Sequence, residues 1–125
     1  MHDGARRFEL GTPALAAVYA QLGGLEYIEE IGVAAIREVT AALTEDLVAT
    51  LRGAGFKPSV AADARDRSAI VMVPMPDPAA SVRHLAAGNI IADTRPGFVR
   101  FSPFFYNVQE DHARATERLA SQPAH

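Results

Sequence analysis

Few residue types in this 125-residue sequence could perform covalent or metal chemistry. Lys57 is its sole lysine, so any reaction that needs an amine side chain has a single candidate. Cysteine is absent, which excludes a disulfide framework, a thiolate zinc site and a cysteine nucleophile. His84 and His112 lie on predicted helices without ligand partners at useful spacing, and we interpret both as surface histidines. We therefore assign no catalytic residue and no metal ligand.

The other eleven Lys/Arg residues are arginines, and two of them lie near the C-terminus, Arg95 in a predicted turn and Arg100 in the strand that follows it. Arg95 follows Asp93 by two residues, a spacing that favours a local ion pair within the turn. Arg100 alternates onto the strand face of Phe98 and Ser102, because successive strand side chains point to opposite sides. Taken alone, such a residue is typical of a solvated or salt-bridged arginine.

Two helices are predicted before these arginines. The first spans residues 12–31, with Thr12 as N-cap and Pro13 at the first helical position. Its apolar side chains recur at helical spacing and its opposite side is small rather than charged, so we expect both sides to be buried against partners; the small residues are Ala14, Ala16, Ala17, Ala20, Gly23 and Gly24. The second helix spans residues 33–52 and ends at Gly53 and Gly55.

The rest of the chain reads as short strands and two more helices. In order, we expect strands at 56–61 and 68–75, a helix from 77 to 88, strands at 90–93 and 98–102 joined by a turn at 94–97, and a helix capped by Asn107 and Glu110 that ends near 121. The order α-α-β-β-α-β-β-α predicts an α+β fold in which helices cover a small mixed or antiparallel sheet.

Charge and hydropathy exclude several classes of function. The net charge of −3 and the pI near 5.7 argue against a nucleic-acid partner, since no basic face would neutralise phosphates. No apolar run reaches the roughly 20 residues that span a bilayer, and the N-terminus has no signal-peptide core. We expect a globular, cytoplasmic protein.

Two segments carry a resemblance to a known family. They are RFELGTP at residues 7–13 and DTRPGFVRFS at residues 93–102, the second followed by Phe105-Tyr106-Asn107 and Glu110-Asp111. Together they resemble the C-terminal part of pyridoxal-phosphate enzymes of the class V aminotransferase family, over residues 7–119. The resemblance implies one domain over 1–125, with residues 12–31 as connecting helix, residues 32–125 as the small C-terminal α+β domain, and the large cofactor domain absent.

The resemblance also implies roles for four residues. Gly11 and Thr12 would approach the cofactor phosphate of a neighbouring subunit, which suits a hydroxyl and a backbone N–H at a helix N-terminus. Arg100 would hold the substrate α-carboxylate through its planar guanidinium, and Arg95 would assist. The implied partners are the missing large domain or a homodimer partner, and a small amino-acid substrate.

The family's chemistry needs a lysine that forms a Schiff base with pyridoxal phosphate. Lys57 lacks the Ser/His context of that lysine, so this chain alone is predicted to be inactive. The absence of cysteine argues against a desulfurase with a cysteine nucleophile and leaves a transaminase, an epimerase-like enzyme or a lyase. The alternative is a stand-alone, non-catalytic α+β binding or dimerisation module derived from such an enzyme.

Overall fold

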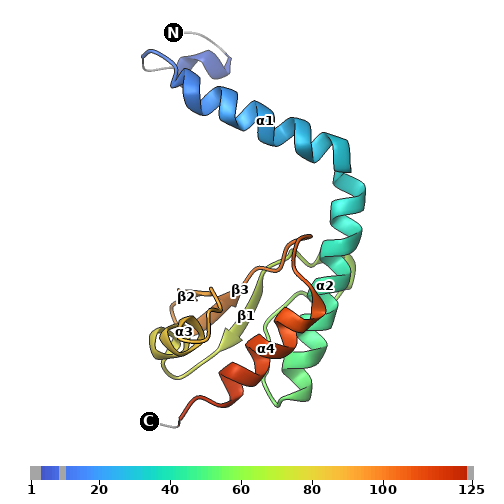
Figure 1. The fold of residues 1–125 in the computed structure, drawn as a ribbon, viewed down its shortest axis with the longest axis vertical. Coiled ribbons are helices and arrows are strands. Elements are labelled where there is room, and N and C mark those ends of the chain that lie inside the picture. The colour runs from blue at the N-terminus through green and yellow to red at the C-terminus, as the bar shows by residue number, and fades with distance from the viewer. Residues whose placement is uncertain (1–3, 9–10, 124–125) are drawn as a thin grey trace. The chain divides into compact units, whose positions relative to one another are not determined.

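The computed structural model describes residues 4–8 and 11–123, which form two compact units over residues 1–35 and 36–125. The first unit holds a short 3-10 helix, η1 (Ala5–Phe8), and the helix α1 (Leu15–Ile31). Gly32 ends α1 in the left-handed region, with φ of 89°, and its N–H donates to the Ile28 carbonyl. The next helix, α2 (Val33–Gly53), starts directly after this turn and continues into the second unit (Figure 1).

The N-terminus of α1 differs from the sequence prediction. The N-cap position is Ala14, so Thr12 lies outside the helix and its predicted capping role is wrong. A capping hydroxyl must reach the N–H groups of the first turn, and here that turn starts three residues beyond Thr12. The Leu15 N–H instead donates to the Pro13 carbonyl at 2.9 Å.

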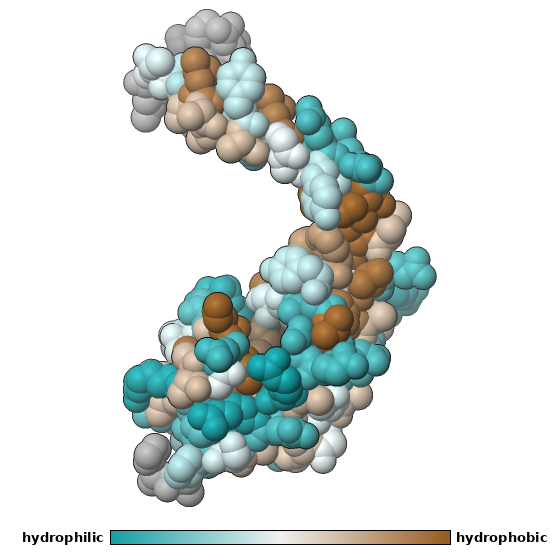
Figure 2. All heavy atoms as spheres, in the orientation of Figure 1, coloured by the Kyte–Doolittle hydropathy of each residue, from teal (hydrophilic) through white to brown (hydrophobic). Residues whose placement is uncertain are grey.

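Within the first unit, α1 has no buried residue. Figure 2 shows hydrophobic side chains at the surface of this segment. Six of its larger apolar residues are about half exposed or more, namely Leu15, Val18, Tyr19, Leu22, Leu25 and Tyr27, while Ile28 and Ile31 are half-buried. None of the helices in the described part of the chain has the length and apolar character needed to cross a membrane.

The second unit is an α+β layer. Besides the main part of α2 it contains η2 (Ala64–Asp66), β1 (Val71–Pro74), α3 (Pro78–Ala86), β2 (Asp93–Arg95), β3 (Phe98–Phe101) and α4 (Gln109–Ala120). The three strands form an antiparallel sheet in the order β1-β3-β2. The predicted fold class is confirmed.

Two predicted strands differ in the structure. The expected strand at 56–61 pairs only at Ser59, which bridges to Met72, because Pro58 cannot donate to a ladder. The expected strand at 90–93 begins only at Asp93. The N–H of Ile90 closes the end of α3 by donating to the Leu85 carbonyl, so residues 90–92 do not join the sheet.

The core lies between one face of the sheet and the helices. Its members come from α2 (Leu47, Val48, Leu51), β1 (Val71, Val73), α3 (Leu85), β3 (Val99, Phe101) and α4 (Ala115, Leu119). The strand residues in this set are register partners, Val71 with Phe101 and Val73 with Val99, and therefore share one face. The alternate strand residues must lie on the other face.

The N-terminus of α4 is capped one residue later than predicted. The helix starts at Gln109 with Val108 at the N-cap, and the Val108 N–H donates to the carboxylate of Asp111 rather than of Glu110. Asn107 instead closes the preceding turn, where its amide oxygen accepts from the Phe104 N–H at 2.9 Å. The pKa of Asp111 lies below its ordinary value, chiefly because the Asn107 side chain donates to its carboxylate.

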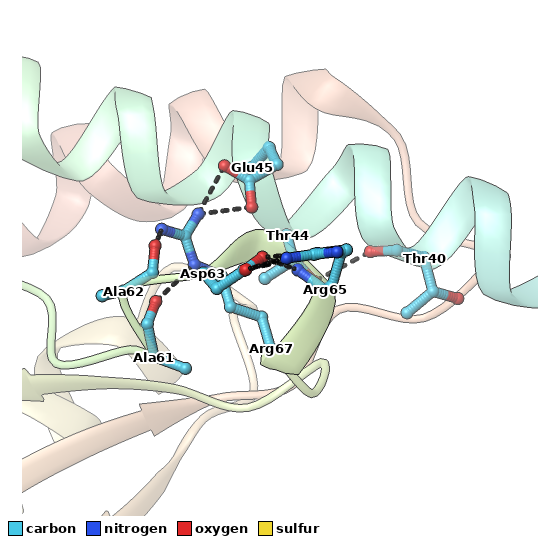
Figure 3. A network of polar contacts seen from close by, with 8 residues as sticks. All are labelled: Thr40, Thr44, Glu45, Ala61, Ala62, Asp63, Arg65 and Arg67. Atoms are coloured by element: carbon cyan, nitrogen blue, oxygen red, sulfur yellow. Dashed lines mark hydrogen bonds and ion pairs between the residues drawn. The ribbon is translucent and has the colours of Figure 1, made fainter.

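Arg67 fastens the loop before β1 to helix α2 (Figure 3). Its Nη1 donates to both carboxylate oxygens of Glu45, while Nε and Nη2 donate to the carbonyls of Ala61 and Ala62 at 2.7 and 3.0 Å. The Arg67 side chain is only 11% exposed, whereas its partner Glu45 is 47% exposed. Arg65 and Asp63 form a separate, exposed ion pair in the same loop.

His112 joins α4 to α2, which corrects its prediction as a surface histidine. It is 4% exposed, and its Nδ1 donates to Asp46 Oδ2 at 2.7 Å. The sequence held the signal, because His112 shares helical spacing with the buried Ala115, Thr116 and Leu119. Its Nε2 and the Thr40 and Thr116 hydroxyls are buried polar groups without a hydrogen-bond partner among the described residues.

We predict that removing Asp46 lowers the stability of the fold more than removing His112 does. Asp46→Ala leaves the buried Nδ1 without an acceptor and should lower the free energy of unfolding by about 1–3 kcal/mol. His112→Leu fills the buried site with apolar volume and leaves the Asp46 carboxylate, which is 28% exposed, to be hydrated, so it should cost less, about 1 kcal/mol or less. Urea unfolding measures both, with Glu38→Ala, which removes an exposed carboxylate of the same helix, as control. Equal losses for Asp46→Ala and Glu38→Ala would contradict the pairing.

Candidate functional site

The second face of the sheet carries both predicted substrate-binding arginines. Ladder pairing places Arg100 between Met72 of β1 and Asp93 of β2, and places Phe98 between Pro74 and Arg95. We call these six side chains the arginine face. None of them belongs to the buried core, and all are half-buried or exposed. The predicted alternation of Arg100 onto the side of Phe98 is confirmed by this register.

Asp93 brings the two arginines together. Its Oδ2 lies 2.6 Å from Arg95 Nη1 and 2.9 Å from Arg100 Nη2, and its Oδ1 accepts from the Thr94 N–H at 2.7 Å. The predicted local pair of Asp93 and Arg95 is confirmed. The Arg100 contact was not predicted, because it depends on the β2–β3 register rather than on sequence spacing.

The Arg100 side chain is 30% exposed and is only partly engaged. Its Nη2 is ion-paired to Asp93, whereas its Nε is buried and has no hydrogen-bond partner among the described residues. A guanidinium can donate five hydrogen bonds in a planar fork, so Arg100 retains the capacity to bind a carboxylate.

The pKa of Asp93 lies below its ordinary value. The largest cause is the hydrogen bond from the Thr94 N–H, followed by that from Arg95, with further attraction from the charge of Arg100. These contacts all favour the ionised form, and Asp93 is therefore a carboxylate at neutral pH.

Gly11 and Thr12 belong to the first unit, in an exposed bend before α1. The Thr12 hydroxyl has no hydrogen-bond partner in the described part of the chain, and no described atom comes within 4 Å of a Cβ built on Gly11. Both residues are therefore open to a ligand or partner. Lys57 is also exposed, in the loop that follows α2.

A cavity of about 450 Å³ lies between the end of β3 and α4, and its lining includes Arg114 but neither Arg95 nor Arg100. Its lining includes Asn107, Asp111 and His112, which already hold the helix cap and the Asp46 pair. Among the described residues, no group of three or more histidine or acidic side chains could hold a metal ion. Because two guanidiniums share a single carboxylate there, the arginine face is the better candidate for binding a small anion.

Comparison with known proteins identifies the family of this chain. Residues 1–94 match the family model of aminotransferase class-V. The chain belongs to the class V aminotransferase family. The match ends before β3, so it includes Gly11, Thr12 and Asp93 but not Arg95 or Arg100.

Two individual proteins resemble this class V aminotransferase chain over most of its length. The uncharacterized aminotransferase YcbU of Bacillus subtilis (strain 168) is 29% identical over 121 residues, which are 97% of this chain and 32% of that protein. The apo structure of cysteine desulfurase from Thermococcus onnurineus NA1 has the same fold, with a TM-score of 0.81 and 21% identity over 90% of this chain and 32% of that one. The chain thus spans about a third of the length of each.

We predict that the Asp93 pKa depends on Arg95. Arg95→Gln removes a hydrogen bond and a positive charge, so the Asp93 pKa should rise toward the ordinary value for aspartate. In the wild type the ion pairs persist as the pH falls, until the carboxylate is protonated at its lowered pKa. Carboxyl ¹³C shifts, followed from about pH 6 to about pH 2, measure the midpoint. Arg65→Gln, which disrupts only the pair with Asp63, should leave it unchanged; an equal midpoint in wild type and Arg95→Gln would refute the contact.

Proposed function

We propose that this chain is the small C-terminal domain of a pyridoxal-phosphate-dependent, class V aminotransferase-like enzyme that acts on an amino acid. In this proposal it binds the substrate carboxylate and contributes to a dimer contact. The observation that carries the proposal is Arg100, half-buried on the open face of the sheet with unused donors. Family membership and the length of the relatives support it.

Arg100 would bind the α-carboxylate of the substrate, and its position in β3 would fix where its side chain lies. Val99 and Phe101, its neighbours in β3, are buried in the core and fix the direction in which Arg100 projects. Arg95 would add a second positive charge near the same carboxylate. Their shared contact to Asp93 keeps both guanidiniums near one position before any substrate binds, which lowers the entropy lost on binding.

Gly11 and Thr12 fit a contact with the cofactor phosphate of a neighbouring subunit. The open backbone at Gly11 allows close approach, and the Thr12 hydroxyl, which has no partner among the described residues, can donate to a phosphate oxygen. When bound, pyridoxal phosphate supplies an electron sink for bonds at the substrate α-carbon. This chain's own part would be limited to the phosphate contact and the carboxylate contact.

Lys57 does not fit the role of the cofactor lysine. Its side chain is exposed and lies in a loop between Phe56 and Pro58, whereas a Schiff-base lysine needs a site that holds the cofactor ring. We place that lysine in the part of the enzyme that the longer relatives have and this chain does not, so this chain alone would be inactive. An amino-acid transaminase, an epimerase-like enzyme and a lyase all remain compatible with a cysteine-free domain.

The exposed apolar residues of α1 would contact the missing large domain or a homodimer partner. Leucines on a soluble helix gain stability only when another surface covers them, and contiguous apolar patches mark such interfaces. The N-terminal position of α1 agrees with a connecting helix between a large domain and this one.

We predict that Arg100→Ala in the complete enzyme weakens binding of the amino-acid substrate by about 2–5 kcal/mol, because the substrate carboxylate loses a charged partner. Arg100→Lys should restore only part of the affinity, since an ammonium cannot make two parallel hydrogen bonds. Spectroscopic titration of the cofactor-loaded enzyme measures the change. Arg65→Ala, which removes an exposed arginine paired with an aspartate two residues away, is the control. Unchanged affinity in Arg100→Ala would refute the assignment.

We also predict that the chain on its own self-associates through α1. Leu22→Glu and Leu25→Glu place charges on the exposed apolar residues and should shift the species seen by analytical ultracentrifugation toward the 13.4 kDa monomer. Ile91→Glu changes a residue of the second unit that is 98% exposed, and should leave the association unchanged. Monomeric wild-type chain at all concentrations would contradict this role for α1.

A further inference from the structure

The arginine face contains an acid that the proposed carboxylate contact does not explain. Asp93 already occupies part of the hydrogen-bonding capacity of Arg95 and Arg100, through one shared oxygen atom. It is ionised at neutral pH because its contacts favour the carboxylate. A substrate that binds Arg100 must therefore bind beside a fixed negative charge.

The six residues of the arginine face together carry one net positive charge. Two guanidiniums and one carboxylate leave one net positive charge, and Met72, Pro74 and Phe98 are uncharged. One positive charge complements one carboxylate. A second negative group on the ligand would gain little further attraction from the arginines, and would be repelled by Asp93.

We propose that Asp93 is a positioning and specificity-determining residue, which holds Arg100 in place and restricts the arginine face to ligands with a single negative group. The implied substrates are amino acids with uncharged side chains rather than dicarboxylic amino acids. This inference rests on the proposed function of Arg100 as the carboxylate ligand. The apolar side chains of Met72 and Phe98 beside Arg100 agree with an uncharged substrate.

Anion binding to a series of charge variants tests the inference. The probes are acetate and succinate, titrated into the ¹⁵N-labelled chain at pH 7 and constant ionic strength, with the Arg100 Nε–H resonance as readout. Asp93→Asn raises the net charge of the face by one and retains a side-chain oxygen for the Thr94 N–H. A dianion interacts with this added charge twice as strongly as a monoanion, so the ratio of succinate to acetate affinity should rise about fivefold.

A second variant changes the ratio in the opposite direction. Arg95→Gln makes the face neutral, and the ratio of succinate to acetate affinity should fall about fivefold. It also keeps the test decisive if Asp93→Asn does not fold. A merely structural role for Asp93 would change both affinities by the same factor and leave the ratio constant.

Asp63→Asn is the matched control. Asp63 pairs with an arginine two residues later and accepts a backbone N–H, as Asp93 does, but it lies in the loop before β1. Its loss should leave the ratio at wild-type level. If acetate shifts Arg100 but the ratio is equal in wild type, Asp93→Asn and Arg95→Gln, the inference is overturned and the proposed function stands. If acetate shifts Arg100 in none of these proteins, the carboxylate role of Arg100 fails.

Discussion

The antiparallel pairing of β3 with both of its neighbours is the constraint on which the rest of the second unit depends. Since side chains alternate across a strand, this one register sends Val99 and Phe101 into the core and Arg100 to the opposite face. It also brings Asp93 opposite Arg100, so the ion pairs of the arginine face are a consequence of backbone pairing. A register shift by one residue would bury the guanidinium and expose the valine, and both changes are costly. The stability of the core and the position of Arg100, the proposed substrate-binding residue, therefore both follow from the register of β3.

The sheet is small, and two polar contacts compensate by fixing the segments around it. Arg67 satisfies four acceptors at once and holds the loop that leads into β1 against α2, so it orients the strand next to β3. The Asp46–His112 pair links α2 to α4 on the other side of the core. Because one partner of each contact is largely buried, with the Arg67 side chain 11% exposed and that of His112 6% exposed, these contacts restrict geometry more than the exposed Asp63–Arg65 pair does.

The sequence predicted the features that depend on local periodicity. The helices α2 and α4, the strands β1 and β3, the side of β3 that Arg100 occupies and the ion pair of Asp93 with Arg95 all follow from spacings of two to four residues. The features that were predicted wrongly or not at all depend on longer-range geometry or on competing hydrogen bonds. Thr12 follows the preferences of a cap, yet the helix starts at Leu15. The contact of Asp93 with Arg100 needs the strand register, and Asp46 lies 66 residues from His112. Among the site residues, Arg100 and Arg95 came from a resemblance to a family, since an isolated arginine on a strand does not by itself indicate a ligand.

The buried polar atoms of α2 and α4 also affect which part of the second unit opens most readily. The hydroxyls of Thr40 and Thr116 and the Nε2 of His112 are removed from solvent without gaining a hydrogen bond from the described residues, whereas on the described strands only the Arg100 Nε shares this state. Breaking the His112–Asp46 contact and moving α4 outward would hydrate the His112 Nε2 and so recover part of the free energy lost on burying it. Local opening should therefore begin at α4, and its amide hydrogens should exchange with solvent before those of β1 and β3. The strands that display Arg100 would then stay paired while the C-terminal helix fluctuates.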